Sequence, residues 1–293
     1  MKGIVLFSFL LLFAVSCSPA SSASPSSSKI TASIQNKGSD TIVNLALAWA
    51  EAYQKVKPDV SISVTGGGSG TGIAALINGT VDIANASRQI SPDEKQQAQA
   101  KGIMPVEFVI ARDAIAVIVN PENPVSQLTL QQISDVYSGK INNWKVIGGD
   151  NRPIVRLSRE TNSGTHVYFL ETVIRLGDKN NKTLFSMNTL LLPSSEGIIA
   201  EVRDNPNAIG YDGLGYVPHD GSVKVIGVAK QTNAPYVLPS IETVNNNSYP
   251  IARDLYMYTA GEPKGEAKVY LDWVMKSPGA QQIVNDLGFV PIQ

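Results

Sequence analysis

Hydrophobic positions along the chain follow two spacings, and each spacing predicts one kind of secondary structure. Short apolar or alternating segments predict strands, and they fall at residues 30–34, 60–65, 81–87, 106–120, 152–158, 207–213 and 254–259. Apolar positions three and four residues apart predict helices, and they fall at residues 41–58, 73–79, 91–102, 128–140, 166–175, 194–206, 264–276 and 278–288. This alternation of strands and helices predicts an α/β fold with a buried, partly parallel sheet.

The body of the chain is long enough for two lobes of this kind. The chain has 293 residues, of which 43% are hydrophobic, so there is ample apolar material for two cores. We therefore expect two α/β lobes over residues 29–293, with the chain returning to the first lobe near its end.

The first 28 residues have the pattern of an export signal followed by a tether. An apolar run at residues 4–15 is shorter than a membrane-spanning helix and ends just before Cys17. Small residues before a cysteine at this point resemble the bacterial lipobox, although Ala14 stands where that motif more often has Leu. The resemblance implies a signal peptide at residues 1–16, and a lipidated Cys17 with a Ser/Pro tether at residues 17–28. The alternatives are an ordinary signal peptide or a buried free cysteine.

The predicted anchor indicates where the protein is located, and the composition argues against several functional classes. A lipid anchor would hold an exported body at the outer face of the cytoplasmic membrane or in the periplasm. The 24 Lys and Arg residues balance 25 Asp and Glu residues, for a net charge of −1, whereas a general nucleic-acid binder needs a basic surface. One cysteine and two histidines are too few for a multi-cysteine or histidine-rich metal site. We therefore expect no nucleic-acid partner, no metal and no cofactor.

Three loops share one design, in which a strand end is followed by small polar residues and a helix start. They lie at residues 38–41, 66–72 and 159–165. A helix N-terminus presents unpaired N–H groups and a positive dipole end, and glycines allow a ligand to approach that backbone. With the Ser and Thr hydroxyls, these groups can form an anion site. Arg159 can hold an oxyanion through two nitrogens, and Arg88 could add a second cation.

Each of these features also has a simpler interpretation. A glycine- and serine-rich loop is often an ordinary turn, and an arginine after a strand often forms a surface ion pair. The recurrence of the same loop design on two lobes favours a ligand site.

The spacing of the glycines argues against enzymes that use similar loops. A P-loop needs Lys after its last glycine, where this chain has Ile73, and residues 66–72 lack the glycine spacing of the dinucleotide motif. A nucleophile elbow centred on Ser69 would need glycine at Thr71. Neither histidine belongs to an evident Ser-His-Asp set. We expect no enzymatic activity.

Eight short motifs span nearly all of the body. They are GSDT at 38–41, GGGSGTGI at 66–73, NGTVDIANASR at 78–88, SGKINNWKVIGGDNRPI at 138–154, RETNSGT at 159–165, NAIGYDGLGY at 207–216, YPIARDLYMYT at 249–259 and GFVPI at 288–292. In this order they resemble the phosphate-binding proteins (PstS) of bacterial high-affinity phosphate ABC transporters. The RETNSGT loop together with the glycine loop is the most specific part of the resemblance.

The resemblance implies a two-lobed periplasmic-binding-protein fold of type II, each lobe a mixed sheet flanked by helices, with a two-strand hinge. Lobe I would comprise residues 29–115 and 245–293, and lobe II residues 116–244. The hinge would fall near residues 113–120 and 240–247. Inorganic phosphate would lie in the cleft between the lobes. The protein, a monomer, would deliver phosphate to the membrane permease subunits of an ABC transporter.

Carried over residue by residue, the resemblance places phosphate at the three loops. The ligand-binding residues would be Ser39, Asp40, Thr41, Ser69, Gly70, Arg159, Ser163, Gly164 and Thr165, with Arg159 as the charge partner. One position departs from the best-known family pattern, because the strand after the glycine loop ends in Ser87-Arg88 where well-known members have Ser-Asp. In those members the Asp accepts a hydrogen bond from protonated phosphate, and a buried acceptor discriminates against unprotonated sulfate.

With Arg88 in that place, the acceptor must come from elsewhere, and the candidates are Asp40 and then Glu160. Arg88 would be either a second cationic anchor for phosphate or part of an ion pair outside the cleft. The departure leaves open a binding protein for another tetrahedral oxyanion, such as sulfate, molybdate or tungstate. Two further possibilities are a phosphate-ester hydrolase and an additional role in adhesion or signalling at the cell surface.

Overall fold

The computed structural model describes residues 30–292, so the predicted signal peptide, Cys17 and the tether lie outside it. The strands are β1 (Ala32–Gly38), β2 (Val60–Thr65), β3 (Ile83–Ala86), β4 (Val106–Val119), β5 (Gln127–Thr129), β6 (Val155–Arg159), β7 (Leu190–Leu192), β8 (Ala208–Gly213), β9 (Lys224–Val225), β10 (Gly227–Ala229) and β11 (Ala252–Thr259). The α-helices are α1 (Asp40–Val56), α2 (Ser69–Ile77), α3 (Pro92–Ala100), α4 (Leu130–Tyr137), α5 (Gly164–Phe169), α6 (Ser195–Asp204), α7 (Ile241–Asn245), α8 (Gly265–Lys276) and α9 (Pro278–Asp286). Shorter turns are the 3₁₀-helices η1 (Trp144–Ile147) and η3 (Leu214–Tyr216) and the π-helix η2 (Leu170–Ile174). No helix within this described part has both the length and the apolar composition needed to cross a bilayer.

One mixed sheet runs through the molecule, in the strand order β2-β1-β3-β11-β4-β8-β6-β7. β1 is parallel to β2 and β3, and β6 is parallel to β7 and β8. β11 runs antiparallel to β3 and β4, and β4 runs antiparallel to β8. Because the carboxyl ends of parallel strands meet at one edge, the loops that follow β1, β2 and β3 open on the same edge of the sheet.

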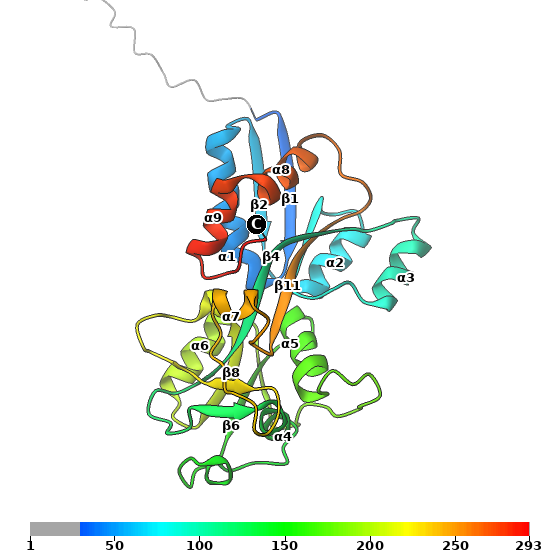
Figure 1. Ribbon diagram of the computed structural model, residues 1–293. Helices are drawn as coiled ribbons and strands as arrows, with labels where there is room; N and C mark the ends of the chain where they lie inside the picture. The colour runs from blue at the N-terminus through cyan, green and yellow to red at the C-terminus, as the bar shows by residue number, and fades with distance from the viewer. Residues whose placement is uncertain (1–29, 293) are drawn as a thin grey trace, which may run out of the picture.

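β4 and β11 lie in the middle of the sheet and connect the two halves of the molecule (Figure 1). β4 pairs with β11 as far as Ala114 and with β8 from Ile115 onward. Lobe I is the half built on β1–β3 with α1, α2, α3, α8 and α9, and lobe II is the half built on β6–β8 with α4, α5 and α6. The finer boundaries, at residues 115 and 245, stay a prediction.

Each lobe has a hydrophobic core of its own. In lobe I, Trp49 of α1 is fully buried, and its Nε1 donates a hydrogen bond to the Ala280 carbonyl of α9 at 2.8 Å. In lobe II, the rings of Phe169 and Tyr211 stack with centroids 3.6 Å apart, and Tyr137 meets both rings edge-on. Full burial of one large apolar side chain contributes about 1.5–3 kcal/mol. Each lobe is therefore stabilised by its own contacts, as a hinged pair of lobes requires.

Most of the predicted elements are present, and the differences concern where they begin and end. The helix predicted from residue 73 begins at Ser69, inside the glycine loop. The helix predicted from residue 166 begins at Gly164, and its second half is the π-helix η2. The prediction of one helix at residues 128–140 was wrong in its first part, which is the strand β5. The helix α4 starts only after Thr129, because Thr129 and Gln132 form a capping box at that point.

Candidate functional site

The turn between β1 and α1 places the first predicted loop at a contact between the lobes. β1 continues to Gly38, four residues beyond its predicted end, and Gly38 has a φ of +148°. A Cβ atom at Gly38 would lie 2.1 Å from the Asn85 carbonyl oxygen, so this position requires glycine. The Ser39 N–H donates to the same carbonyl at 2.9 Å. Ser39 and Thr41 are both buried.

The glycine loop places Ser69 at the first residue of α2. Gly68 before it has a φ of +92°, a conformation that favours glycine. The Ser69 Oγ accepts a hydrogen bond from the Ser87 N–H at 3.0 Å. The Gly70 N–H donates to the Asn162 carbonyl of lobe II at 3.0 Å. Ser69 and Gly70 therefore also stand where the lobes touch.

The third loop leads into α5 of lobe II, with Ser163 as its N-cap. The Ser163 Oγ accepts a hydrogen bond from the Thr165 N–H at 3.2 Å. A Cβ atom on Gly164 would lie 2.3 Å from the Ser69 Oγ and 2.6 Å from the Ser87 Oγ. The start of α5 thus lies directly against the start of α2, and glycine is required there by close approach.

Two threonines, one from each lobe, connect the first and third loops. The Oγ1 atoms of Thr41 and Thr165 lie 2.8 Å apart, and both side chains are buried. The structure therefore brings together most of the residues predicted to bind the ligand. They are Ser39, Thr41, Ser69, Gly70, Ser163, Gly164 and Thr165.

Arg159 and Asp40 are paired across the same contact. Arg159, at the end of β6, is 1% exposed. Its Nη2 lies 2.7 Å from the Asp40 Oδ2, and its Nη1 donates to the Ser195 Oγ at 2.8 Å. The Asp40 Oδ1 accepts from the Gly67 N–H at 2.8 Å. Asp40 therefore links the predicted cation of lobe II to the glycine loop of lobe I.

Arg88 faces an acidic partner on α3. Its Nη1 and Nη2 donate to the two carboxylate oxygens of Glu94 at 2.8 and 2.7 Å. Burial alone would raise the pKa of Glu94, but the hydrogen bonds from Arg88 and from the Ser91 N–H outweigh burial, and the pKa is lowered. Gly70 is close, since a Cβ atom there would lie 3.8 Å from the Arg88 Nη2. Arg88 is thus held in an ion pair at the border of the glycine loop.

Two buried carboxylates and a second buried arginine of the site were not among the predicted residues. Arg253 of β11 pairs with Asp113 of β4 at 2.9 Å, and both are buried. Burial raises the pKa of Asp113 to about 6 against the opposing effect of Arg253. Asp212 accepts from the Ser195 Oγ at 3.0 Å, and burial raises its pKa as well. The signal in the sequence is a charged residue inside an otherwise apolar strand, as for Asp113 in 106–120.

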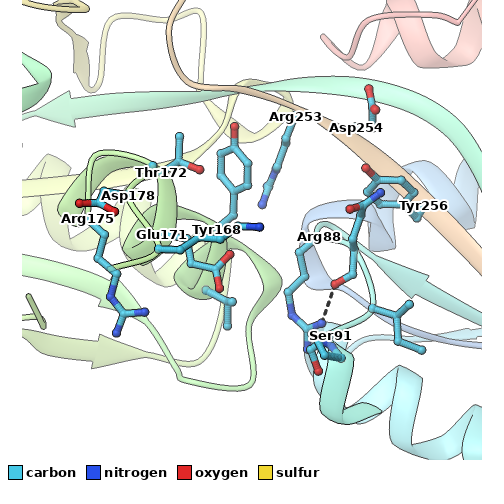
Figure 2. A pocket seen from close by; sticks show the side chains of 16 residues that line it. Arg88, Ser91, Tyr168, Glu171, Thr172, Arg175, Asp178, Arg253, Asp254 and Tyr256 are labelled. Atoms are coloured by element: carbon cyan, nitrogen blue, oxygen red, sulfur yellow. Dashed lines mark hydrogen bonds between the residues drawn. The ribbon is translucent and has the colours of Figure 1, made fainter. Parts of the chain in front are cut away.

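A cavity of about 780 Å³ lies between the lobes beside these loops. Figure 2 shows Arg88 and Tyr256 from lobe I on one side of it and Tyr168 and Glu171 from lobe II on the other, with Arg253 between them. Arg88 and Arg253 therefore line the cavity and also lie next to the three loops.

The described residues offer no metal site, because no three or more His, Cys, Asp or Glu side chains within residues 30–292 are grouped to hold an ion. His166 lies next to the third loop, but its ring stacks on Phe185 and its Nδ1 lies 3.0 Å from the Ser158 Oγ. Burial lowers the pKa of His166. The surroundings of His166 are therefore those of a structural, uncharged histidine.

Two lobes joined by two crossing strands, with loops from both lobes facing one another, are the architecture of a periplasmic binding protein of type II. A family model described as the PBP superfamily domain matches residues 23–278. The phosphate-binding protein PstS of Pseudomonas aeruginosa is 32% identical, over 90% of this chain and 84% of its own length. PstS of Bacillus subtilis is 31% identical, over 98% of this chain and 92% of its own length.

Solved structures agree with these relatives. A phosphate ABC transporter substrate-binding protein of Clostridium perfringens, solved with bound phosphate, is 36% identical with a TM-score of 0.79, covering 89% of this chain and 100% of its own. A phosphate transport receptor of Vibrio cholerae is 27% identical with a TM-score of 0.70, covering 88% of this chain and 99% of its own. The chain belongs to the PstS-like family of phosphate-binding proteins. The predicted type II fold is confirmed, and the protein is a binding protein and not an enzyme.

Proposed function

We propose that this protein binds inorganic phosphate at the contact of the three loops and delivers it to the permease of an ABC transporter. The observation that carries the proposal is the meeting of Thr41 and Thr165, one from each lobe, next to Asp40, which pairs with the buried Arg159. Relatives with 31–32% identity over most of the chain are phosphate-binding proteins. An anion held at this point would touch both lobes, so its binding would favour their closure.

The donors for phosphate are the hydroxyls and the backbone N–H groups of the three loops. They come from Ser39, Thr41, Ser69, Ser163, Gly164 and Thr165, and from Gly70 once its N–H leaves the Asn162 carbonyl. Arg159 supplies the charge, and a direct contact of its guanidinium group with phosphate would require that one of its bonds to Asp40, Ser195 or Pro193 open. Hydrogen bonds to a charged ligand in a closed, poorly hydrated site are stronger than the same bonds in water. Micromolar affinity requires only about −8 kcal/mol, a modest total for so many donors after the cost of desolvation.

Asp40 is the best candidate for the acceptor that recognises the proton of hydrogen phosphate. Its carboxylate lies at the contact between the lobes, next to Arg159 and the glycine loop. Glu160, the second candidate, is exposed. Sulfate carries no proton at neutral pH, so it could not donate to the Asp40 lone pairs that Arg159 and the Gly67 N–H leave free, and it would bind more weakly.

Arg88 is better described as a structural ion pair than as an anchor for phosphate. Both of its terminal nitrogens are used by Glu94. A role in binding would require that this pair open.

Export and lipid anchoring at Cys17, with a monomeric body at the outer face of the membrane, complete the proposal. They rest on the pattern of residues 1–28. Labelling with a radioactive fatty acid would detect the anchor, and a Cys17→Ser variant that keeps the label would contradict it.

Calorimetric titration of the phosphate-stripped protein tests the proposed function. We expect tight binding of phosphate and no heat with sulfate at pH 6 and pH 8. Equal binding of both anions would instead define a general oxyanion-binding protein. No binding of either anion would contradict the proposal, and molybdate would be titrated next.

A further inference from the structure

Arg253 lies on the strand β11, where the chain passes between the lobes. Its side chain is 2% exposed, and it is the strand neighbour of Asp113 on β4. The Nε and Nη2 atoms of Arg253 lie 3.2 and 2.9 Å from the same oxygen of Asp113, Oδ2. Two contacts to one carboxylate oxygen fix the plane of the guanidinium group. The ion pair therefore determines the direction of the remaining N–H groups.

The remaining contacts of Arg253 are divided between the two lobes. In lobe I, its Nη1 donates to the Ser87 carbonyl at 2.8 Å, and its Nη2 lies 3.4 Å from the Thr41 Oγ1. In lobe II, the same Nη2 donates to the Thr165 Oγ1 at 3.0 Å. The Tyr168 ring, one turn further along α5, has its centroid 5.6 Å from the Arg253 Cζ, and Figure 2 shows the two side chains next to each other. One cation of the hinge thus touches both lobes.

The chemistry of these contacts constrains the threonine hydroxyls. A hydroxyl has one hydrogen and two lone pairs, whereas a guanidinium group can only donate. An oxygen that accepts from Arg253 must direct its own hydrogen to another partner. Thr41 and Thr165 both accept from Arg253, and one of the two hydroxyls donates its hydrogen to the other across 2.8 Å. The one remaining hydrogen of the pair is therefore turned away from Arg253 and is available to an acceptor on the far side.

We propose that Arg253 is a positioning residue for phosphate, which orients the hydrogen-bonded hydroxyl pair of Thr41 and Thr165 so that its remaining hydrogen points toward the anion, and which links this alignment to closure of the lobes. This inference rests on the proposed function, because it takes the three loops as the phosphate site. A simple ion pair with Asp113 would need only a positive charge. Arginine supplies a planar set of five donors that reaches Asp113, Ser87 and both threonines at once, which lysine cannot do.

Titration calorimetry with inorganic phosphate tests the inference on the Arg253→Lys variant. We expect its Kd to rise about 10- to 100-fold, since one or two charge-assisted hydrogen bonds to the threonines are lost. Arg112→Lys is the matched control. Arg112 is the neighbour of Asp113 on β4, is partly exposed, and lies 3.7 Å from Asp254. Its variant should keep the wild-type Kd within about twofold.

A double-mutant cycle with Thr165→Val separates positioning from a merely structural role. The quantity compared is the fold-increase in Kd caused by Arg253→Lys, measured once in the wild type and once in the Thr165→Val variant. If Arg253 acts through the threonines, this fold-increase will be at least about threefold smaller in the Thr165→Val variant. An undiminished fold-increase in that variant would overturn the inference, because Arg253 would then act directly on phosphate or only on the fold.

The two proposals fail in different ways. If the wild-type protein binds no phosphate, the proposed function is wrong and the inference falls with it. If the wild type binds and Arg253→Lys binds equally well, only the inference is wrong. Thermal unfolding would be recorded for every variant.

If Arg253→Lys does not fold, Asp113→Asn replaces it, because this change loosens the plane of the guanidinium group. The fold-increase in Kd caused by Asp113→Asn should then also be smaller in the Thr165→Val variant than in the wild type. An equal fold-increase in both would overturn the inference.

Discussion

Arg159 and Asp40 form an ion pair between the lobes, with the Arg159 Nη2 2.7 Å from the Asp40 Oδ2. Asp40 is the first residue of α1 in lobe I, and Arg159 ends β6 in lobe II. The two charges cancel, so the pair alone does not attract a dianion strongly. Affinity must then come from the many N–H and O–H donors, while the carboxylate remains as an acceptor. Such a combination suits an anion that carries a proton.

Replacement of Arg159 by lysine should weaken phosphate binding at least about 30-fold. Lysine keeps the charge but loses the planar geometry that serves Asp40 and Ser195 together. Calorimetric titration would measure the change. Alanine is a poorer choice, because loss of a partner from a buried ion pair costs about 3–5 kcal/mol of stability. Arg152→Lys, on an arginine of lobe II whose side chain pairs with Asp150, is the control, and equal Kd values for both variants would contradict the assignment.

Replacement of Asp40 by asparagine should reduce the preference for phosphate over sulfate at least about 10-fold. The amide can donate to sulfate, and it no longer supplies two acceptor oxygens for the proton of hydrogen phosphate. The measurement is the ratio of the two Kd values at one pH. Glu160→Gln is the matched control, since it neutralises the other candidate acceptor. A loss of preference in Glu160→Gln and not in Asp40→Asn would transfer the role to Glu160.

Local patterns were sufficient to predict the three loops and nearly all of the main helices. A helix start, its cap and its glycines are set within a few residues, so GSDT, GGGSGTG and RETNSGT could be predicted as loops from local sequence, and their recurrence favoured a ligand site. Helix starts were less accurate. α2 begins at Ser69 and α5 at Gly164. The two helix ends contact each other closely, and this contact extends both helices into their loops. A local sequence pattern does not contain that information.

Partners far apart in the chain could not be predicted from spacing. Arg253 and Asp113 are 140 residues apart, and their pairing depends on the register of β11 against β4. The partner of Arg88 was within reach of the sequence. Ser91 and Glu94 have the spacing of a capping box, which places the Glu94 carboxylate at the start of α3, next to Arg88.

Replacement of Glu94 by glutamine should lower stability near neutral pH and leave a smaller deficit in acid. Burial raises the pKa of Glu94, but Arg88 and Ser91 lower it further, and the net pKa lies below the ordinary value of 4.5. A carboxylate with a lowered folded-state pKa stabilises the protein above 4.5 and loses this contribution as the pH falls through the folded-state pKa. Urea unfolding of wild type and variant at several pH values between 7 and about 3 would measure the difference. Asp93→Asn, at the exposed neighbour on α3, should show a smaller pH-dependent difference, and parallel curves for wild type and Glu94→Gln would contradict the prediction.

Replacement of Gly164 by alanine should prevent full closure of the lobes and raise the Kd for phosphate about 100-fold. The added Cβ would lie 2.3 Å from the Ser69 Oγ of lobe I, so α5 and α2 could not keep their contact. The fold of each lobe should persist, because alanine is favoured over glycine in a helix by about 1 kcal/mol. Small-angle scattering should show compaction by phosphate in the wild type and not in the variant. Gly261→Ala, at a glycine whose added Cβ would meet nothing within 4 Å, should bind phosphate normally. Normal compaction and a normal Kd in Gly164→Ala would mean that phosphate binding does not need the lobes to meet at α2 and α5.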